Sequence, residues 1–171
     1  MKTENIIIRN VEEKDIPSVV DIQINGWRTA YKGIVDDEYL DSMNREERIE
    51  KRKKDYKNSG FIVAELNNEV VGFTRYVYDN SFSPDKEDVD CELMAIYVRP
   101  DLKRNGIGRK LFKYVLDEFK DKNKTKMILW CLKDNEPSKA FYKKMGGIET
   151  YEKPADIGGK VYYEVGFLYD V

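Results

Sequence analysis

Two glycines at the expected start of a helix mark the segment whose residue types best suit chemistry. Gly106 and Gly108 follow a strand-like run and open an amphipathic one. Glycine has no Cβ, so backbone N–H groups can converge there on a ligand, and with the helix dipole they favour a phosphate or pyrophosphate. Basic side chains accompany them at Lys103, Arg104 and Arg109. The segment therefore predicts an anion site, although a helix entry that needs glycine for its own geometry explains the same pattern.

The residue types left for proton transfer are few. The chain has no histidine and two cysteines, Cys91 and Cys131. Ser-His and Cys-His nucleophile pairs are therefore excluded, and neither a metal site nor a disulfide framework is expected. Carboxylates and phenols remain as the acid–base candidates.

Length and charge describe the chain as a whole. Its 171 residues suit one domain spanning 1–171, without repeat or linker. With 30 basic and 32 acidic residues, the net charge of −2 does not call for a nucleic acid or a membrane partner. No apolar run reaches about 20 residues and no signal pattern opens the chain, so we expect a cytoplasmic protein.

Hydrophobic periodicity predicts an alternating order of strands and helices. The expected helices are 16–26, 36–42, 44–56, 106–121 and 134–145, and the expected strands are 5–9, 61–66, 70–78, 92–98, 127–132, 148–153 and 160–169. This order indicates a single α/β domain.

Three segments allow two interpretations each. The charged helix 45–57 is a solvated face or an anion site, and its interleaved glutamates argue against nucleic acid. The acidic loop 79–90 is solvated or attracts a cationic partner. The final strand, 160–169, is apolar on both faces, and pairing with a second subunit in a homodimer would explain that.

Two motifs at a fixed separation make the chain resemble the GNAT acetyltransferase superfamily. The first, Lys103-Arg-Asn-Gly106-Ile-Gly108, follows Tyr97-Val98-Arg99-Pro100, and Lys103 stands where the family has Arg or Gln. The second runs from Asn135 through Phe141-Tyr142 to Gly146. The resemblance spans nearly the whole chain. It implies a mixed sheet of about seven strands, splayed between strands 4 and 5 and flanked by about four helices.

The resemblance also implies how acetyl-CoA would bind. The pantetheine arm would pair with the backbone between the splayed strands, the loop amides would hold the pyrophosphate, and a strand N–H would support the developing oxyanion. The residues implied for the cofactor are Ile96, Tyr97, Val98, Lys103, Arg104, Asn105, Gly106, Ile107, Gly108, Arg109, Asn135 and Tyr142. No metal is implied.

Acetyl transfer by direct attack on the thioester needs an acceptor for the amine's proton and a donor for the departing thiolate. The family's usual thiol-side acid falls on Tyr142, whose alternative role is packing beside Phe141. Glu92 is the best base candidate, with a strand-start salt bridge as its alternative. Trp27 and Tyr31 fall where such enzymes shape the acceptor pocket, or else they form a lid on the core.

The expected function is therefore acetylation of a primary amine on a small molecule or peptide. A catalytically silent module of the same fold, which binds acyl-CoA without turning it over, is the alternative.

Overall fold

The central sheet of the computed structural model, which describes residues 5–171, has the strand order β1-β2-β3-β4-β5-β7-β6. Every neighbouring pair is antiparallel except β4 and β5, which are parallel. The strands are β1 (Ile7–Asn10), β2 (Gly60–Leu66), β3 (Glu69–Val77), β4 (Cys91–Val98), β5 (Lys126–Leu132), β6 (Ile148–Ile157) and β7 (Lys160–Asp170).

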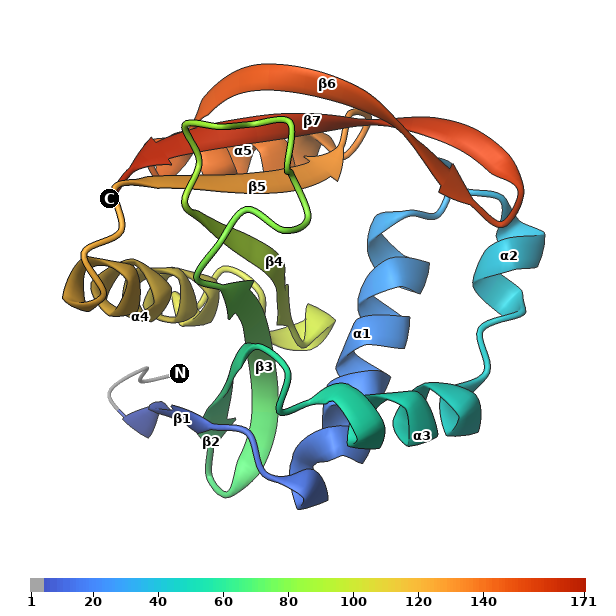
Figure 1. The fold of residues 1–171 in the computed structure, drawn as a ribbon. Coiled ribbons are helices and arrows are strands. Elements are labelled where there is room, and N and C mark those ends of the chain that lie inside the picture. Colours follow the sequence, from blue (N-terminus) through green and yellow to red (C-terminus); the bar gives the residue numbers. More distant parts are fainter. Residues whose placement is uncertain (1–4) are drawn as a thin grey trace.

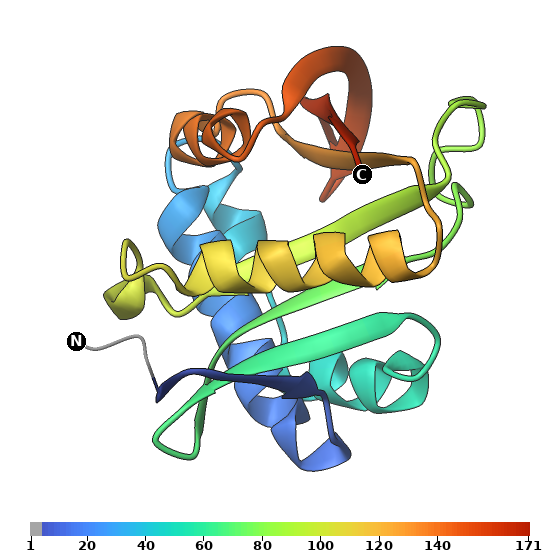
Figure 2. The same cartoon turned by 90° about the vertical axis from the view of Figure 1, so that its left-hand side faces the viewer.

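Helices cover both faces of this sheet (Figures 1 and 2). They are α1 (Ile16–Ala30), α2 (Asp37–Asp41), α3 (Arg45–Asp55), α4 (Ile107–Asp121) and α5 (Glu136–Lys144), with short 3-10 turns at Glu13–Asp15 and Pro100–Leu102. The stripe Leu111, Phe112, Val115 of α4 is fully buried against one face, in a core that also includes Tyr142 of α5. Residues of α1, α2 and α3 pack on the opposite face.

The contact between β4 and β5 is short. Only Cys91 with Met127 and Glu92 with Ile128 are paired, and beyond them the two strands run apart. On its other edge β4 stays paired with β3, with one irregularity at Met94, since Arg75 pairs with Ala95 and Tyr76 with Leu93. One edge of β4 is therefore left without a strand partner from Leu93 onward.

The predicted fold class is confirmed: one mixed sheet of seven strands, splayed between β4 and β5, with helices on both sides. Residues 5–171 form five α-helices, one more than the resemblance implied, and the helices predicted at 36–42 and 44–56 are α2 and α3. The predicted strand 148–153 continues to Ile157, and Gly158 and Gly159, with φ of 62° and 84°, make the turn to β7. Such positive φ values at both turn residues suit a tight hairpin.

The predicted end of the first helix at Asn25–Gly26 is wrong. The helix α1 continues to Ala30, so Trp27 and Tyr31 lie one turn apart on the same side of it. A Cβ at Gly26 would lie 2.9 Å from Cδ1 of Tyr97. Glycine is therefore needed here for close packing of α1 on β4, not for ending a helix.

The apolar residues on both faces of β7 pack within the chain. Val165, Phe167 and Tyr169 join the core under α4 and α5, whereas Tyr162 packs against the cluster formed by α1, α2 and α3. A second subunit is not required to cover this strand, and the homodimer stays a prediction. In the described residues no helix is long and apolar enough to cross a membrane, and Cys91 and Cys131 are free thiols.

Candidate active site

The glycine-bearing loop between β4 and α4 presents free backbone donors. Gly106 has a φ of 79° and precedes the first residue of α4. The first helical hydrogen bond of α4 runs from the amide of Lys110 to the carbonyl of Gly106. No acceptor within residues 5–171 faces the backbone amides of residues 103–106, and those of 107–109 precede that first bond. Asn105 stabilises the loop, since its Nδ2 donates to the carbonyl of Leu102 over 3.1 Å.

The cationic side chains of this loop are also free. Lys103, Arg104 and Arg109 are exposed, and none of them belongs to an ion pair with another residue in the described part of the chain. Their charges add to the positive end of the α4 dipole. The loop can therefore hold a group with more than one negative charge.

The open edge of β4 lies next to this loop. Gly72, Phe73 and Thr74 pair with one edge of the stretch from Ile96 through Tyr97 to Val98, whereas the edge toward β5 has no strand partner. An extended ligand can add to such an edge through main-chain hydrogen bonds. The irregularity at Met94 disturbs the ladder just before this stretch, which can free an N–H to point into the gap.

Tyr142, on α5, lies at the other side of the gap. Its side chain is 9% exposed, and its hydroxyl makes no hydrogen bond to another described residue. Since no fully buried side-chain oxygen or nitrogen among these residues lacks a partner, the hydroxyl must reach accessible space. Burial raises its pKa, with smaller contributions from Cys131 and Tyr97. The phenol is therefore protonated at neutral pH and able to donate.

Asn135 caps the start of α5. Its Oδ1 accepts a hydrogen bond from the amide of Ser138 over 3.3 Å. The residue is 5% exposed, and its Nδ2 is not bonded to any other residue that the structure describes. By the argument used for Tyr142, this amide nitrogen opens to accessible space and can donate to a ligand.

Aromatic residues from α1 and β4 meet at the same place. Nε1 of Trp27 donates to the Tyr97 hydroxyl over 2.7 Å. The Tyr31 side chain also lies close to that of Tyr97, and the Trp27 and Tyr31 rings lie edge to face with centroids 4.8 Å apart. Burial raises the pKa of Tyr31, with contributions from Tyr97 and Tyr142. The predicted acceptor-side residues and the predicted thiol-side acid therefore converge at the gap.

Glu92 lies at the closed end of the gap and is 5% exposed. Its Oε2 accepts a hydrogen bond from the Ser83 hydroxyl over 3.1 Å, and that hydroxyl accepts one from Nε1 of Trp130 over 3.0 Å. Burial raises the pKa of Glu92, while Ser83 and Lys153 lower it. Glu92 forms no ion pair within 4.0 Å with a described residue. The salt bridge considered as its alternative role is therefore not present.

The loop 79–90 is not simply a solvated segment. It crosses near β5 and β7 (Figure 1), where Ser83 is 2% exposed and bonds to both Glu92 and Trp130. Its acidic side chains are mostly exposed, whereas its buried serine closes one side of the site.

Sequence reasoning missed three residues of this region. Trp130 on β5, Lys153 on β6 and Glu164 on β7 lie on the same face of the sheet as Glu92, because Trp130 pairs with Gly166 and Lys153 with Glu164. Burial raises the pKa of Glu164. The alternation of β7 was the one signal available, since Glu164 falls on the face opposite Val165 and Phe167.

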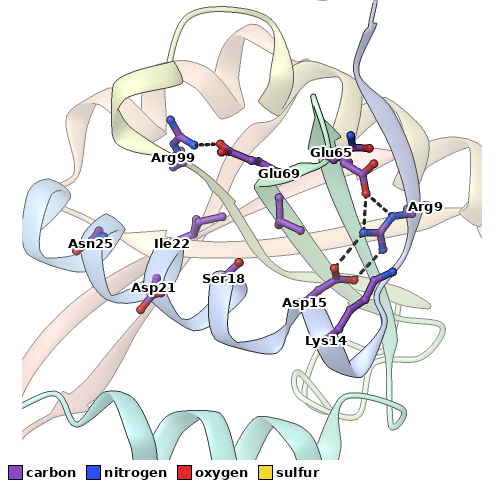
Figure 3. A pocket seen from close by; sticks show the side chains of 12 residues that line it. Arg9, Lys14, Asp15, Ser18, Asp21, Ile22, Asn25, Glu65, Glu69 and Arg99 are labelled. Carbon is purple, nitrogen blue, oxygen red and sulfur yellow. Dashed lines mark hydrogen bonds and ion pairs between the residues drawn. The ribbon is translucent and has the colours of Figure 1, made fainter.

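The pocket drawn in Figure 3 lies elsewhere, between the start of α1, the turn from β2 to β3, and Arg99. Its volume is about 680 Å³, and none of the predicted site residues lines it. Arg9 spans its wall, with ion pairs to Asp15 and Glu65, each at 2.7 Å. This network joins β1, the 3-10 turn before α1, and β2, which indicates a structural role.

Comparison with known proteins agrees with the geometry. The family model described as "Acetyltransferase (GNAT) family" matches residues 24–147. The uncharacterized N-acetyltransferase YuaI of Bacillus subtilis is 29% identical over 164 residues, which cover 94% of this chain and 91% of that protein.

Solved structures share the fold. The PaiA N-acetyltransferase of Thermoplasma acidophilum, in complex with coenzyme A, superposes with a TM-score of 0.75 at 22% identity, over 96% of this chain and 99% of the other. An N-acetyltransferase of Staphylococcus aureus gives a TM-score of 0.70 at 19% identity, over 98% and 99% of the two chains.

Proposed function

Because this chain belongs to the GNAT acetyltransferase family, we propose that it transfers the acetyl group of acetyl-CoA to a primary amine of a small molecule or peptide. The observation that carries this proposal is the open edge of β4, which lies between a loop of free donors and the meeting point of Tyr31, Tyr97 and Tyr142.

The loop suits the charged end of coenzyme A. In the proposal, the amides of residues 104–109 bind the pyrophosphate, and Lys103, Arg104 and Arg109 balance its charge. The pantetheine arm carries amides that can pair with the open edge of β4 from Ile96 to Val98. The Nδ2 of Asn135 is free to donate to the same arm. The thioester would then lie near Tyr142.

The reaction needs a free amine, an oxyanion site and a proton for sulfur. The amine nitrogen attacks the thioester carbonyl, the C–S bond breaks, and the amide C–N bond forms. Glu92, directly or through water, takes the amine's proton. An N–H freed near Met94 supports the oxyanion, and the Tyr142 hydroxyl donates to the departing thiolate.

A binding module without catalysis is the alternative. It would use the same loop and the same edge of β4, but it would not need Glu92 in a buried position or a free phenol facing the gap. Both features are unfavourable for a purely structural site, since burying a carboxylate without an ion pair costs stability. They favour the enzyme.

A thiol-release assay with a panel of amines tests the proposal. Diamines, amino acids and peptides are each incubated with acetyl-CoA, and free coenzyme A is measured. We expect release that depends on one class of amine. Acetyl-CoA that raises the melting temperature without release for any amine would favour the binding module, and the absence of any thermal shift at millimolar acetyl-CoA would exclude both.

A further inference from the structure

A lysine ammonium lies on an aromatic ring at the edge of the proposed acceptor site. Nζ of Lys153 is 4.0 Å from the centroid of the Trp130 ring and 4.0 Å from Oε2 of Glu164. A ring face and a carboxylate are the groups that bind an alkylammonium ion in proteins. This part of the chain therefore already holds one such group, supplied by its own side chain.

The ring and the carboxylates come from adjacent strands. Trp130 packs against Gly166, where a Cβ would lie 3.0 Å from the indole, so the ring lies flat on β7 beside Glu164. Trp130 is linked to Glu92 through the hydroxyl of Ser83. The ring of Trp130 and the carboxylate of Glu164 are called the ammonium site below, and Glu92 lies next to it.

The charges in and next to the ammonium site do not balance. Glu92 and Glu164 are both partly or fully buried and repel each other, while Lys153 is the cation that acts on both. Lys86, the lysine of the loop 79–90, pairs with Asp85 and lies over the ring of Tyr151 instead. Two carboxylates therefore share one ammonium, and their excess negative charge attracts a second cation.

The carboxylate of Glu92 gives independent evidence that a ligand binds here. It is 5% exposed, and only its Oε2 is bonded to a described residue. Because no fully buried polar side-chain atom in residues 5–171 lacks a partner, Oε1 must face accessible space. A nearly buried carboxylate oxygen that opens to the site can accept a hydrogen bond, and then a proton, from the attacking nitrogen of an amine whose second charge lies in the ammonium site.

We propose that the acceptor is a diamine or polyamine, one ammonium of which binds in the ammonium site while the other nitrogen, as the free base, attacks the thioester. Lys153 is the internal occupant that the second ammonium displaces. This inference rests on the proposed acetyl transfer and adds the class of acceptor. An α-amino acid is disfavoured, because its carboxylate would face Glu92 and Glu164.

Two amines that differ only by one ammonium provide the test. 1,4-Diaminobutane and butylamine are compared as acceptors in the thiol-release assay, and the ratio of their kcat/KM values measures the contribution of the second charge. We expect a ratio of at least about ten in favour of the diamine, since a tenfold difference corresponds to about 1.4 kcal/mol and charge-assisted hydrogen bonds reach that range.

Variants show which residues produce the preference for the diamine over the monoamine. Glu164→Gln removes one carboxylate, and we expect the ratio to fall about tenfold. Lys153→Met removes the internal competitor, and we expect the KM for the diamine to decrease several-fold. Lys133→Met is the matched control, because Lys133 pairs with Glu152 over 3.0 Å on the opposite face of β6, and it should leave the ratio unchanged.

Several results would overturn the ammonium site. A ratio near one, a ratio unaffected by Glu164→Gln, or a preference for amino acids over the diamine would overturn the ammonium site. A preference for amino acids would place the substrate's carboxylate near Arg48 of α3. Arg48 has no ion-pair partner in the described residues and lies near Tyr97. If no amine releases thiol, acetyl transfer itself fails. Calorimetric titration of 1,4-diaminobutane into the protein with coenzyme A then tests the ammonium site alone, and lack of binding overturns it.

Discussion

The phenol of Tyr142 combines burial with a hydroxyl that has no hydrogen-bond partner among residues 5–171, and this combination suits a proton donor better than a packing residue. Tyr142→Phe keeps the ring contacts with Phe141 and Phe167 and removes only the hydroxyl. We expect kcat to fall about 10²- to 10³-fold, because the loss of a general acid has effects of that size, with the KM for acetyl-CoA little changed.

Tyr114→Phe is the control for this change, since Tyr114 lies on α4, away from the gap, and packs at the edge of the core. It should retain full activity. Steady-state kinetics on both variants would contradict the assignment if Tyr142→Phe kept more than about a third of the wild-type kcat, because a general acid contributes far more than that.

The pKa of Glu92 is raised by burial, so its protonation should be visible in the pH profile. The attacking amine and Glu92 must each lose a proton, and log(kcat/KM) should therefore steepen as the pH falls through the raised pKa. Glu92→Gln should lower kcat/KM and remove the steep part, leaving the slope of the amine alone. A profile of unchanged shape in the variant would contradict the role as base.

The same shift predicts the effect on stability. A carboxyl whose pKa is higher in the folded state stabilises the fold at low pH, and this contribution is lost as the pH rises through the folded-state pKa. At neutral pH the ionised Glu92 is therefore unfavourable, and Glu92→Gln should melt at or above the wild-type temperature. A decrease of several degrees in a thermal melt would show instead that the ionised carboxylate stabilises the fold.

At the level of elements, the start of α4 depends on the backbone conformation of Gly106. Its φ of 79° is unfavourable for residues with a Cβ, although no atom lies within 4 Å of where that Cβ would be. Gly106→Ala should cost about 1–2 kcal/mol of folding stability and weaken acetyl-CoA binding, as seen in KM or by calorimetry. Gly159→Ala is a close match, with a φ of 84° and the same open space, but it lies in the turn between β6 and β7. It should lose similar stability and keep its affinity for acetyl-CoA. Equal losses of affinity in both variants would argue against acetyl-CoA binding at the loop before α4.

The helix α1 positions the acceptor side through Gly26. In Gly26→Ala the new Cβ must displace the Tyr97 ring, from which it would lie 2.9 Å. Alanine favours a helix by up to about 1 kcal/mol over glycine, which offsets part of the strain. We therefore expect the KM for the amine to rise while the melting temperature changes little. Thr29→Ala, on the exposed side of the same helix, should alter neither. An unchanged KM for the amine in Gly26→Ala would contradict the assignment of Tyr97 to the acceptor site.

Periodicity was sufficient to predict most elements, because α4 and β5 have apolar patterns that only one arrangement buries. The end of α1 was misjudged since Asn25–Gly26 has the composition of a helix stop, and the glycine's close contact with Tyr97 is a tertiary feature. Glu164 was missed for a similar reason. Its proximity to Trp130 and Lys153 depends on the register of β5, β7 and β6, which the local sequence does not encode.

The molecule as a whole consists of two half-sheets, β1 to β4 and β5 to β7, which are joined by two residue pairs at the β4–β5 contact. Beyond that contact the edge of β4 has no strand partner. A ligand that adds to this edge and also contacts α5 would connect the halves. Acetyl-CoA should therefore stabilise the whole fold, as binding to the native state requires.

At 100 times its dissociation constant this stabilisation is about 2.7 kcal/mol, or a rise of roughly 5–10 °C in melting temperature for a chain of this size. Hydrogen exchange should slow at residues 96–98 and in β5 as well as at the start of α4. Adenosine 5′-diphosphate 3′-phosphate has the charged groups of coenzyme A but no arm, so it should protect the α4 loop without protecting β5. Equal protection of β5 by both ligands would mean that the arm does not bridge the half-sheets, and that the charged loop alone accounts for cofactor binding.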